Sequence, residues 1–305
     1  MDANALATLG RVFDRAITPV LMNQSVGRQL LPKNMAISGG GIGNTSVLAF
    51  GYVGTADAVT EYNILENFAD TIDLTESTIK IPIQQDMVRI PRRTFETMKS
   101  QGLTPDADYA IQMAKKVSAA LDKTVIQGWK SGNTSYEVNG FFKVAGLSHS
   151  GFDFGTYGGA LKTVGEGVRQ LMENKIFSQG YNLVLHPEQY NKLLMSESAY
   201  GMEELPKVLR MMNQMAGGGE PGQIYVSDYL EPGTGFMAPV ATPANQIYFD
   251  LIEAQQPKHY LSFVNGDTDL GDILMRQIGA AVPRFKYLDS EGLSPTVCKF
   301  TALGG

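Results

Sequence analysis

The sequence predicts an α+β fold with a long central helix, and three local patterns carry this prediction. Ile79, Ile81 and Ile83 alternate with polar residues and proline, which is the period of a half-buried β-strand. Apolar residues recur at three- and four-residue spacing over residues 105–127, which predicts an amphipathic helix. The stretch Tyr181–Leu185, which is mostly apolar, predicts a buried strand. Helices and strands therefore share a chain of 305 residues, enough for one large domain or two modest ones.

The composition argues against several classes of protein. The chain is 43% hydrophobic and only 18% charged, with 33 glycines and 14 prolines, which favours many turns and contacts with other chains. The formal net charge of −6, without a dense Lys/Arg run, argues against sequence-specific nucleic-acid binding. The single cysteine, Cys298, excludes an internal disulfide framework. No apolar run approaches the ~18 residues of a membrane span, and residues 1–15 lack a signal-peptide pattern. We therefore expect a cytoplasmic protein without membrane contact.

Residues 1–45 are expected to form an N-terminal arm. A short helix is expected over residues 3–17, with Phe13 on its apolar face. The following stretch is apolar but irregular, and it ends in a glycine-rich crossing at residues 38–44. Because such an arm has no core of its own, it needs a partner surface. We expect it to be an assembly element, with residues 1–34 dispensable for folding.

The next segment, residues 46–91, is predicted to be extended. Residues 52–88 are expected to form a long two-stranded loop that projects from the fold, here called the excursion. An isolated two-stranded ribbon is marginal in water. Its apolar face, which is expected to contain Ile79, Ile81 and Ile83, would be a large exposed patch on a monomer. The excursion is therefore predicted to lie across a neighbouring molecule.

The excursion is also acidic, and a basic cluster lies at its base. Its scattered apolar residues include Ile64 and Phe68. Arg89, Arg92 and Arg93 form the nearest dense basic cluster, so a neighbour's copy of them can meet the acidic residues. Such surface pairs mostly set register and selectivity, with modest energy each.

The strongest helix signal follows this base. Thr104, Pro105 and Asp106 supply an N-cap, a proline at the first helical position and an acid in the first turn. At ~1.5 Å per residue, the helix is a rod of roughly 36 Å that ends at Gly128. Its buried face is expected to contain Ile111, Ala114, Leu121 and Val125, widened by Met113, Val117 and Ala120.

The rest of the chain predicts an α/β unit and closing strands. Helices are expected at residues 160–175, 187–196 and 202–212. Strands are expected at residues 223–226, 246–252 and 259–264, and long strands within residues 272–303.

Motifs for catalysis or ligand binding are poorly matched. The glycine-rich run at residues 39–43 has Asn44 where a dinucleotide fingerprint needs its third glycine. A calcium loop starting at Asp267 would need glycine and glutamate where Asp272 and Ile278 stand. The three histidines lie in separate segments without metal-ligand spacing, at His149, His186 and His259. We expect no catalytic residue, no cofactor and no metal.

Taken in order, these parts resemble the tailed-virus major capsid fold, and most closely its encapsulin branch. Residues 79–98, IKIPIQQDMVRIPRRTFETM, resemble the encapsulin passage from the extended loop into the short helix before the spine. Residues 114–128, AKKVSAALDKTVIQG, are similar to its spine helix. Residues 182–190, NLVLHPEQY, resemble the strand-to-helix turn of its axial domain. The likeness covers most of the chain, which is longer than a minimal encapsulin.

The resemblance implies a phage-type major capsid fold in four parts. These are an N-terminal arm, an extended β-hairpin loop, a peripheral domain with a long spine helix, and an axial α/β domain. The expected boundaries are 1–45 for the arm, 46–91 for the loop, 92–158 and 265–305 for the peripheral domain, and 159–264 for the axial domain.

The resemblance also implies a non-enzymatic subunit of an icosahedral shell, which associates with itself into pentamers and hexamers. The extra length favours a viral major capsid protein, assembled in the host cytoplasm and located in the virion. Such a shell holds packaged double-stranded DNA without sequence specificity, with portal, scaffolding or decoration proteins as further partners. The alternatives are an encapsulin compartment around a cargo enzyme and a soluble enzyme. Expected interface residues are Phe13, Arg28, Ile64, Phe68, Ile79, Ile81, Ile83, Arg89, Arg92 and Arg93.

Overall fold

The computed structural model describes residues 25–35, 46–51, 75–101, 105–130, 137–215, 221–264, 271–289 and 291–304. These residues form helices and strands in similar measure, so the α+β prediction is confirmed. The expected helix over residues 3–17, together with Phe13, Ile64 and Phe68, lies outside the described residues.

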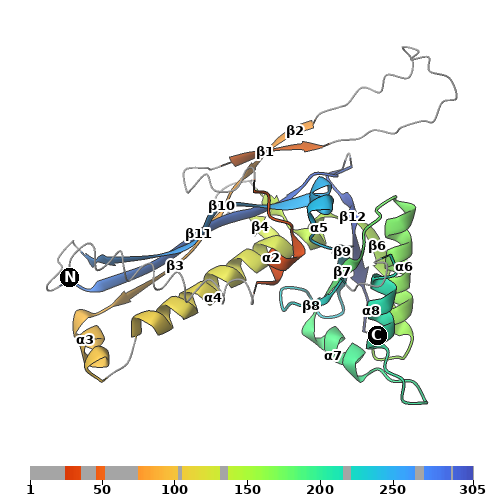
Figure 1. The fold of residues 1–305 in the computed structure, drawn as a ribbon, viewed down its shortest axis with the longest axis horizontal. Coiled ribbons are helices and arrows are strands. Elements are labelled where there is room, and N and C mark those ends of the chain that lie inside the picture. Colours follow the sequence, from red (N-terminus) through yellow and green to blue (C-terminus); the bar gives the residue numbers. More distant parts are fainter. Residues whose placement is uncertain are drawn as a thin grey trace, which may run out of the picture.

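A three-stranded antiparallel sheet and one long helix make the elongated half of the molecule (Figure 1). The strands are β3 (Ile83–Ile90), β10 (Phe249–Phe263) and β11 (Ile273–Phe285), in the order β10-β11-β3. Helix α4 (Pro105–Ile126) packs along one face of this sheet, after the short helix α3 (Arg92–Ser100). The predicted spine helix is therefore present with the expected bounds to within one residue.

The buried face of α4 is close to the expected one but is turned slightly. Ala114, Leu121 and Val125 are buried as expected, and Ile111 is half-buried. Ala120, which was expected to widen the face, is exposed. The buried stripe instead includes the polar side chains of Ser118, Asp122 and Thr124.

A two-stranded ribbon, β1 (Ser46–Gly51) with β2 (Thr75–Lys80), stands apart from this sheet (Figure 1). The excursion was expected to include residues 83–88, but these belong to β3, which pairs with β11 of the same chain. It therefore ends earlier in the sequence than predicted. Pro82 lies between β2 and β3 and lacks an N–H, which favours a break in strand pairing there.

The second half of the molecule is a five-stranded sheet in the order β6-β12-β9-β7-β8. Its helices are α6 (Gly159–Glu173), α7 (Pro187–Met195) and α8 (Leu205–Met212), and α6 packs against β6, β12 and α8 (Figure 1). Gly167 allows this close approach, since a Cβ there would lie 2.5 Å from the Phe300 ring. The strands are β6 (Ala145–Ser150), β7 (Tyr181–Leu185), β8 (Ile224–Val226), β9 (Gly235–Pro239) and β12 (Ser294–Thr301).

Sheet membership differs from the expected domain division. Strands β6 and β12, expected in the peripheral domain, pair in parallel inside the five-stranded sheet. Strand β10, expected in the axial domain, belongs to the three-stranded sheet. The two short strands expected at 246–252 and 259–264 are one strand of 15 residues, preceded by the 3-10 helix η2 (Pro243–Ile247). Irregular pairing between Glu253 and Lys258 lets this strand accommodate Pro257.

Aromatic side chains join the two sheets. Phe141, in the short helix α5 (Phe141–Val144), stacks on Phe236 of β9 with ring centroids 5.2 Å apart. The same ring meets Phe249 of β10 and Phe285 of β11 edge-on, at 5.3 and 5.0 Å. A small ribbon, β4 (Gly128–Lys130) with β5 (Glu137–Asn139), leads from α4 to this helix. The two halves therefore share one apolar core.

Candidate functional site

Residues 25–35, here called the strap, are fixed to the body of their own chain. Helix α2 (Val26–Leu30) begins at Ser25, whose hydroxyl accepts a hydrogen bond from the Arg28 N–H. The Ser25 hydroxyl and the Gly27 N–H both donate to one carboxylate oxygen of Asp122 on α4, at 2.7 and 2.9 Å. Burial raises the pKa of the Asp122 carboxyl, although these hydrogen bonds act in the opposite direction. The strap is thus docked on the spine helix.

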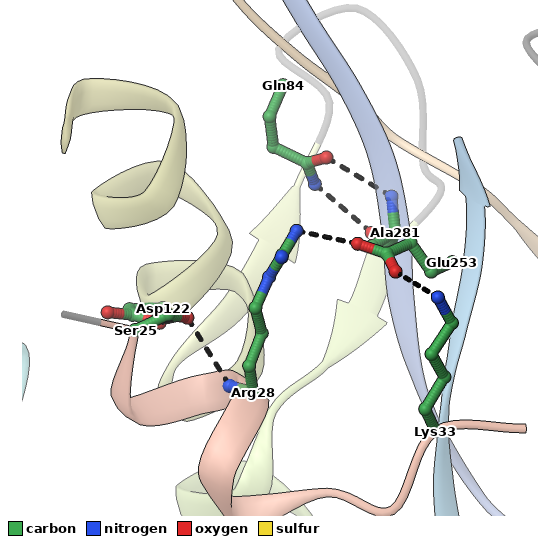
Figure 2. Close-up of polar contacts among 7 residues, drawn as sticks. All are labelled: Ser25, Arg28, Lys33, Gln84, Asp122, Glu253 and Ala281. Atoms are coloured by element: carbon green, nitrogen blue, oxygen red, sulfur yellow. Dashed lines mark hydrogen bonds and ion pairs between the residues drawn. The ribbon is translucent and has the colours of Figure 1, made fainter. Parts of the chain in front are cut away.

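The other end of the strap is tied to β10 by charge and by backbone pairing. Arg28 and Lys33 each approach one carboxylate oxygen of Glu253 at 2.6 Å (Figure 2). The backbone of residues 32–34 bonds to that of Leu251, and Leu30 is buried in the shared core. Arg28, an expected interface residue, therefore makes its ion pair within its own chain.

A second buried carboxylate, Asp250 of β10, binds the strap near its C-terminal end. It pairs with Arg284 at 2.7 Å and Lys286 at 2.8 Å, and accepts a hydrogen bond from the Asn34 side chain. Burial alone would raise the pKa of Asp250, but these hydrogen bonds outweigh it and hold the pKa below its usual value.

The face of the three-stranded sheet opposite α4, here called the open face, presents apolar side chains to solvent. Ile83 and Met87 of β3 are 50% and 59% exposed, and Tyr260 of β10 is 43% exposed. Met87 lies opposite Arg276 of β11, which in turn lies opposite Tyr260, so the three form one row across the sheet. Large apolar side chains in such a row are typical of an interaction surface.

The charged side chains of the open face are mostly basic. Arg276 bonds the side-chain oxygen of Gln85 at 2.7 Å, and Lys258 is exposed one row away. Arg89 pairs with Asp272 at the end of the sheet, at 2.8 Å. A negatively charged partner therefore suits this face.

The structure separates the isoleucines that were expected to share one face. Ile81 is buried against Val138 and Ile252 of its own chain, and Ile79 is half-buried in the same cluster. Only Ile83 is largely exposed. These three isoleucines therefore do not form one exposed apolar face, whereas residues 52–74 of the expected ribbon lie outside the described part of the chain.

The predicted basic cluster lies at the end of β3, and its three arginines differ. Arg89 has the partner described above. Arg92 bonds Glu96 at 3.0 Å, one turn along α3, and its guanidinium lies over the ring of Phe263. Arg93 is exposed on the same helix. Met87, Tyr260 and Arg276 were not identified from the sequence, although the alternation within β3 could have indicated the first.

A groove of about 290 Å³ lies between the strap, α4 and the loop after β8. The apolar part of its wall is formed by Val26 of the strap, Ala119 of α4, Val226 at the end of β8 and Tyr229 beyond that strand. Lys115, Ser118 and Asp122 of α4, together with Ser227 and Asp228, complete the wall, so its lining is mixed apolar and polar. Such a groove suits a small ligand or a short peptide with polar groups of its own.

The described residues show no grouping of three or more His, Cys, Asp or Glu side chains suited to a metal ion. No helix among them has the length and apolar character to cross a membrane. Cys298 is buried, and burial, with a smaller effect of Glu166, raises the pKa of its thiol to about 12.

Residues 45–235 match the family model described as "Encapsulating protein for peroxidase". This is more than half of the chain. The chain belongs to this family. The expected resemblance to the encapsulin branch of the capsid fold is therefore confirmed. No curated protein sequence matches the chain.

Solved structures with this fold include a virus-like particle and a phage capsid. A virus-like particle from Pyrococcus furiosus aligns with a TM-score of 0.60 at 15% identity, covering 94% of this chain and 97% of that one. The capsid of Myoviridae phage XM1 aligns with a TM-score of 0.61 at 11% identity, covering 90% of each chain. A Mycobacterium phage Che8 protein aligns with a TM-score of 0.56 at 13% identity, covering 92% of this chain and 93% of that one. The chain is a shell-forming structural protein of capsid or encapsulin type, which assembles with copies of itself.

Proposed function

We propose that this protein is the major capsid subunit of a virus and that its shell encloses double-stranded DNA. The likeness to the phage XM1 capsid over 90% of both chains carries this proposal. The net charge of −6 supports it, since a shell filled from outside needs no strong affinity for its contents. Portal, scaffolding and decoration proteins are the further partners that such a shell would need.

Assembly would depend on the acidic segment between β1 and β2 lying on the open face of a neighbouring copy. Residues 52–74, between the two strands, contain five carboxylates and no lysine or arginine. The open face offers Arg276, Lys258 and Arg89, with Arg93 nearby on α3. Complementary charge of this kind guides the register of two surfaces.

The exposed apolar side chains of the open face would supply most of the affinity. A fully buried large apolar side chain contributes about 1.5–3 kcal/mol, whereas an exposed ion pair contributes about 0.2–1 kcal/mol. Ile83, Met87 and Tyr260 would therefore outweigh the surrounding charges. Each contact is weak, but a shell repeats it over every neighbour.

The variant Met87→Glu tests the open face. Because Met87 is already exposed, we expect the variant to unfold at the wild-type midpoint but to form no closed shells by electron microscopy. Met87→Leu keeps an apolar side chain of similar size and should assemble normally. Normal shells from Met87→Glu would contradict the role of this face.

The contents of native particles test the viral assignment itself. Particles purified from their source and treated with nuclease should retain double-stranded DNA. Particles that contain an enzyme and no protected DNA would contradict it.

A shell around an enzyme is the second candidate, and the groove beside the strap favours it. The description of the matching family names a peroxidase as the enclosed protein. In this case the groove would hold a short tail of the cargo. Val226→Asp should then assemble into shells that lose their co-purifying protein, whereas it should leave DNA content unchanged in a viral shell.

A further inference from the structure

A small cavity lies where the strap, the spine helix and the three-stranded sheet meet. Its volume is about 10 Å³. Arg28 of α2, Ser118 of α4, Gln84 of β3 and Ala280 of β11 contribute to its wall. Figure 2 shows Arg28 extending from the strap past α4 toward Glu253 and the pair formed by Gln84 and Ala281.

Two polar atoms at this cavity are buried without a partner among the described residues. They are the Nε of Arg28 and the hydroxyl oxygen of Ser118. The guanidinium of Arg28 is held in place because its Nη2 bonds Glu253 at 2.6 Å. Reorienting its Nε–H would therefore require breaking that ion pair. A buried donor left without an acceptor is costly, so such groups in folded proteins have a partner.

Gln84, which also lines the cavity, already has partners for its side-chain amide. The Gln84 amide nitrogen donates to the Ala281 carbonyl at 3.1 Å, and its oxygen accepts from the Ala281 N–H at 3.2 Å. Through these two bonds, Gln84 satisfies the backbone of β11 just beyond the end of its pairing with β3. Both ends of its amide are thereby directed at Ala281, and no hydrogen bond joins it to Arg28 Nε or Ser118 Oγ.

We propose that this cavity binds one ordered water molecule, which accepts a hydrogen bond from Arg28 Nε–H and bonds the Ser118 hydroxyl. A volume of roughly 10–15 Å³ accommodates one water and nothing larger. An apolar cavity of this size stays dry, but polar atoms that lack other partners make hydration favourable.

The water gives the strap a second polar attachment to the spine helix. Ser118 and Asp122 are four residues apart, so they lie on the same face of α4, one turn from each other. Asp122 binds the start of α2 directly, at Ser25 and Gly27. The water binds the same helix through Arg28, whose charge Glu253 of β10 balances. Strap, spine and sheet therefore meet at one hydrated position.

The test compares wild type with Ser118→Ala as assembled full-length protein. In a wild-type electron-microscopy map that resolves ordered waters, a peak should lie about 2.7–3.2 Å from both Arg28 Nε and Ser118 Oγ. In Ser118→Ala the peak should weaken or disappear, and the unfolding midpoint should fall by roughly 2–4 °C.

Thr124→Val is the matched control on the same helix. The Thr124 hydroxyl is also buried, but it donates to the Ala120 carbonyl at 2.9 Å and does not line the cavity. Its removal should leave the water peak in place. The proposal is overturned if the wild-type map shows no peak between the two atoms. It is also overturned if Ser118→Ala is as stable as wild type or more stable, as a dry cavity would predict.

Discussion

At the residue scale, Phe141 connects the two sheets. Its ring contacts one phenylalanine from the five-stranded sheet and two from the three-stranded sheet. We expect Phe141→Ala to lower the free energy of unfolding by about 3–5 kcal/mol, because the neighbouring rings cannot fill the space. Denaturant unfolding measures this, with Phe177→Ala as control, since Phe177 is 57% exposed. Equal stability of the two variants would show that the halves are held by other contacts.

Asp250 makes the free energy of unfolding fall at low pH. Its pKa is held below the usual value, so its contribution is present at neutral pH and is lost as the pH falls below about 4. Asp250→Asn removes the charge that balances Arg284 and Lys286. We expect it to cost about 3–5 kcal/mol near pH 7, with a smaller difference from wild type at pH 3. A difference that stays constant between these pH values would contradict this.

The pKa of Asp122 is shifted in the opposite direction to that of Asp250, so its effect on stability has the opposite dependence on pH. Because burial raises its pKa, its contribution to stability is full below about pH 4 and declines as the pH rises through the folded-state pKa. Asp122→Asn keeps the shape and one acceptor oxygen. We therefore expect the stability of this variant, relative to wild type, to improve between pH 4 and pH 7. Thermal unfolding at both pH values checks the direction, and a relative loss over this interval would disprove it.

At the element scale, one part of the expected N-terminal arm, the strap, is packed on its own chain. Leu30 and Leu31 belong to the shared core, and Asp122 and Glu253 bind strap residues. Deletion of residues 1–34 would therefore remove core side chains and two sets of polar partners, so the expectation that it leaves a folded chain is revised.

Two truncations measure the role of the strap. We expect a chain that starts at residue 25 to keep cooperative unfolding, because every described contact remains. A chain that starts at residue 35 should lose several kcal/mol or accumulate in inclusion bodies. Circular dichroism during heating separates the two, and equal midpoints would mean that the strap contributes little to folding.

Elements with strong local signals could be predicted from the sequence. Pro105 and the apolar spacing after it predicted α4. The predicted strand Tyr181–Leu185 has the same bounds as β7. Pairing between distant strands could not be predicted in this way. Nothing local in residues 83–90 distinguishes a ribbon from an edge strand on β11, and nothing in β12 indicates that it lies between β6 and β9.

The candidate surface was only partly predictable for the same reason. The basic cluster at residues 89–93 and the exposed Ile83 follow from sequence spacing. Tyr260 and Arg276 join Met87 in one row only through the register of three strands that are far apart in the chain. The Asp122 contact with the strap spans 95 residues or more, so the helix pattern alone indicated only a buried position.

At the scale of the whole molecule, charge is unevenly distributed. The net charge is −6, yet the open face is mostly basic while residues 52–79 contain acids and no basic residue. The proposed contact between these two regions of different copies would be attractive and would lie at the surface. Salt screens such attraction, because the Debye length falls from about 10 Å at 0.1 M to about 3 Å at 1 M.

Assembly of purified subunits should therefore slow as salt is added, while subunit stability stays nearly constant. The ion pairs that hold the strap and Asp250 are largely buried and are screened less. Light scattering at low and high salt measures assembly, and denaturant unfolding of the subunit provides the control. Arg276→Glu should slow assembly at low salt and reduce its salt dependence, because one attractive charge becomes repulsive. If assembly instead speeds up with salt in wild type and variant alike, apolar burial alone drives the contact and the acidic segment does not bind the open face.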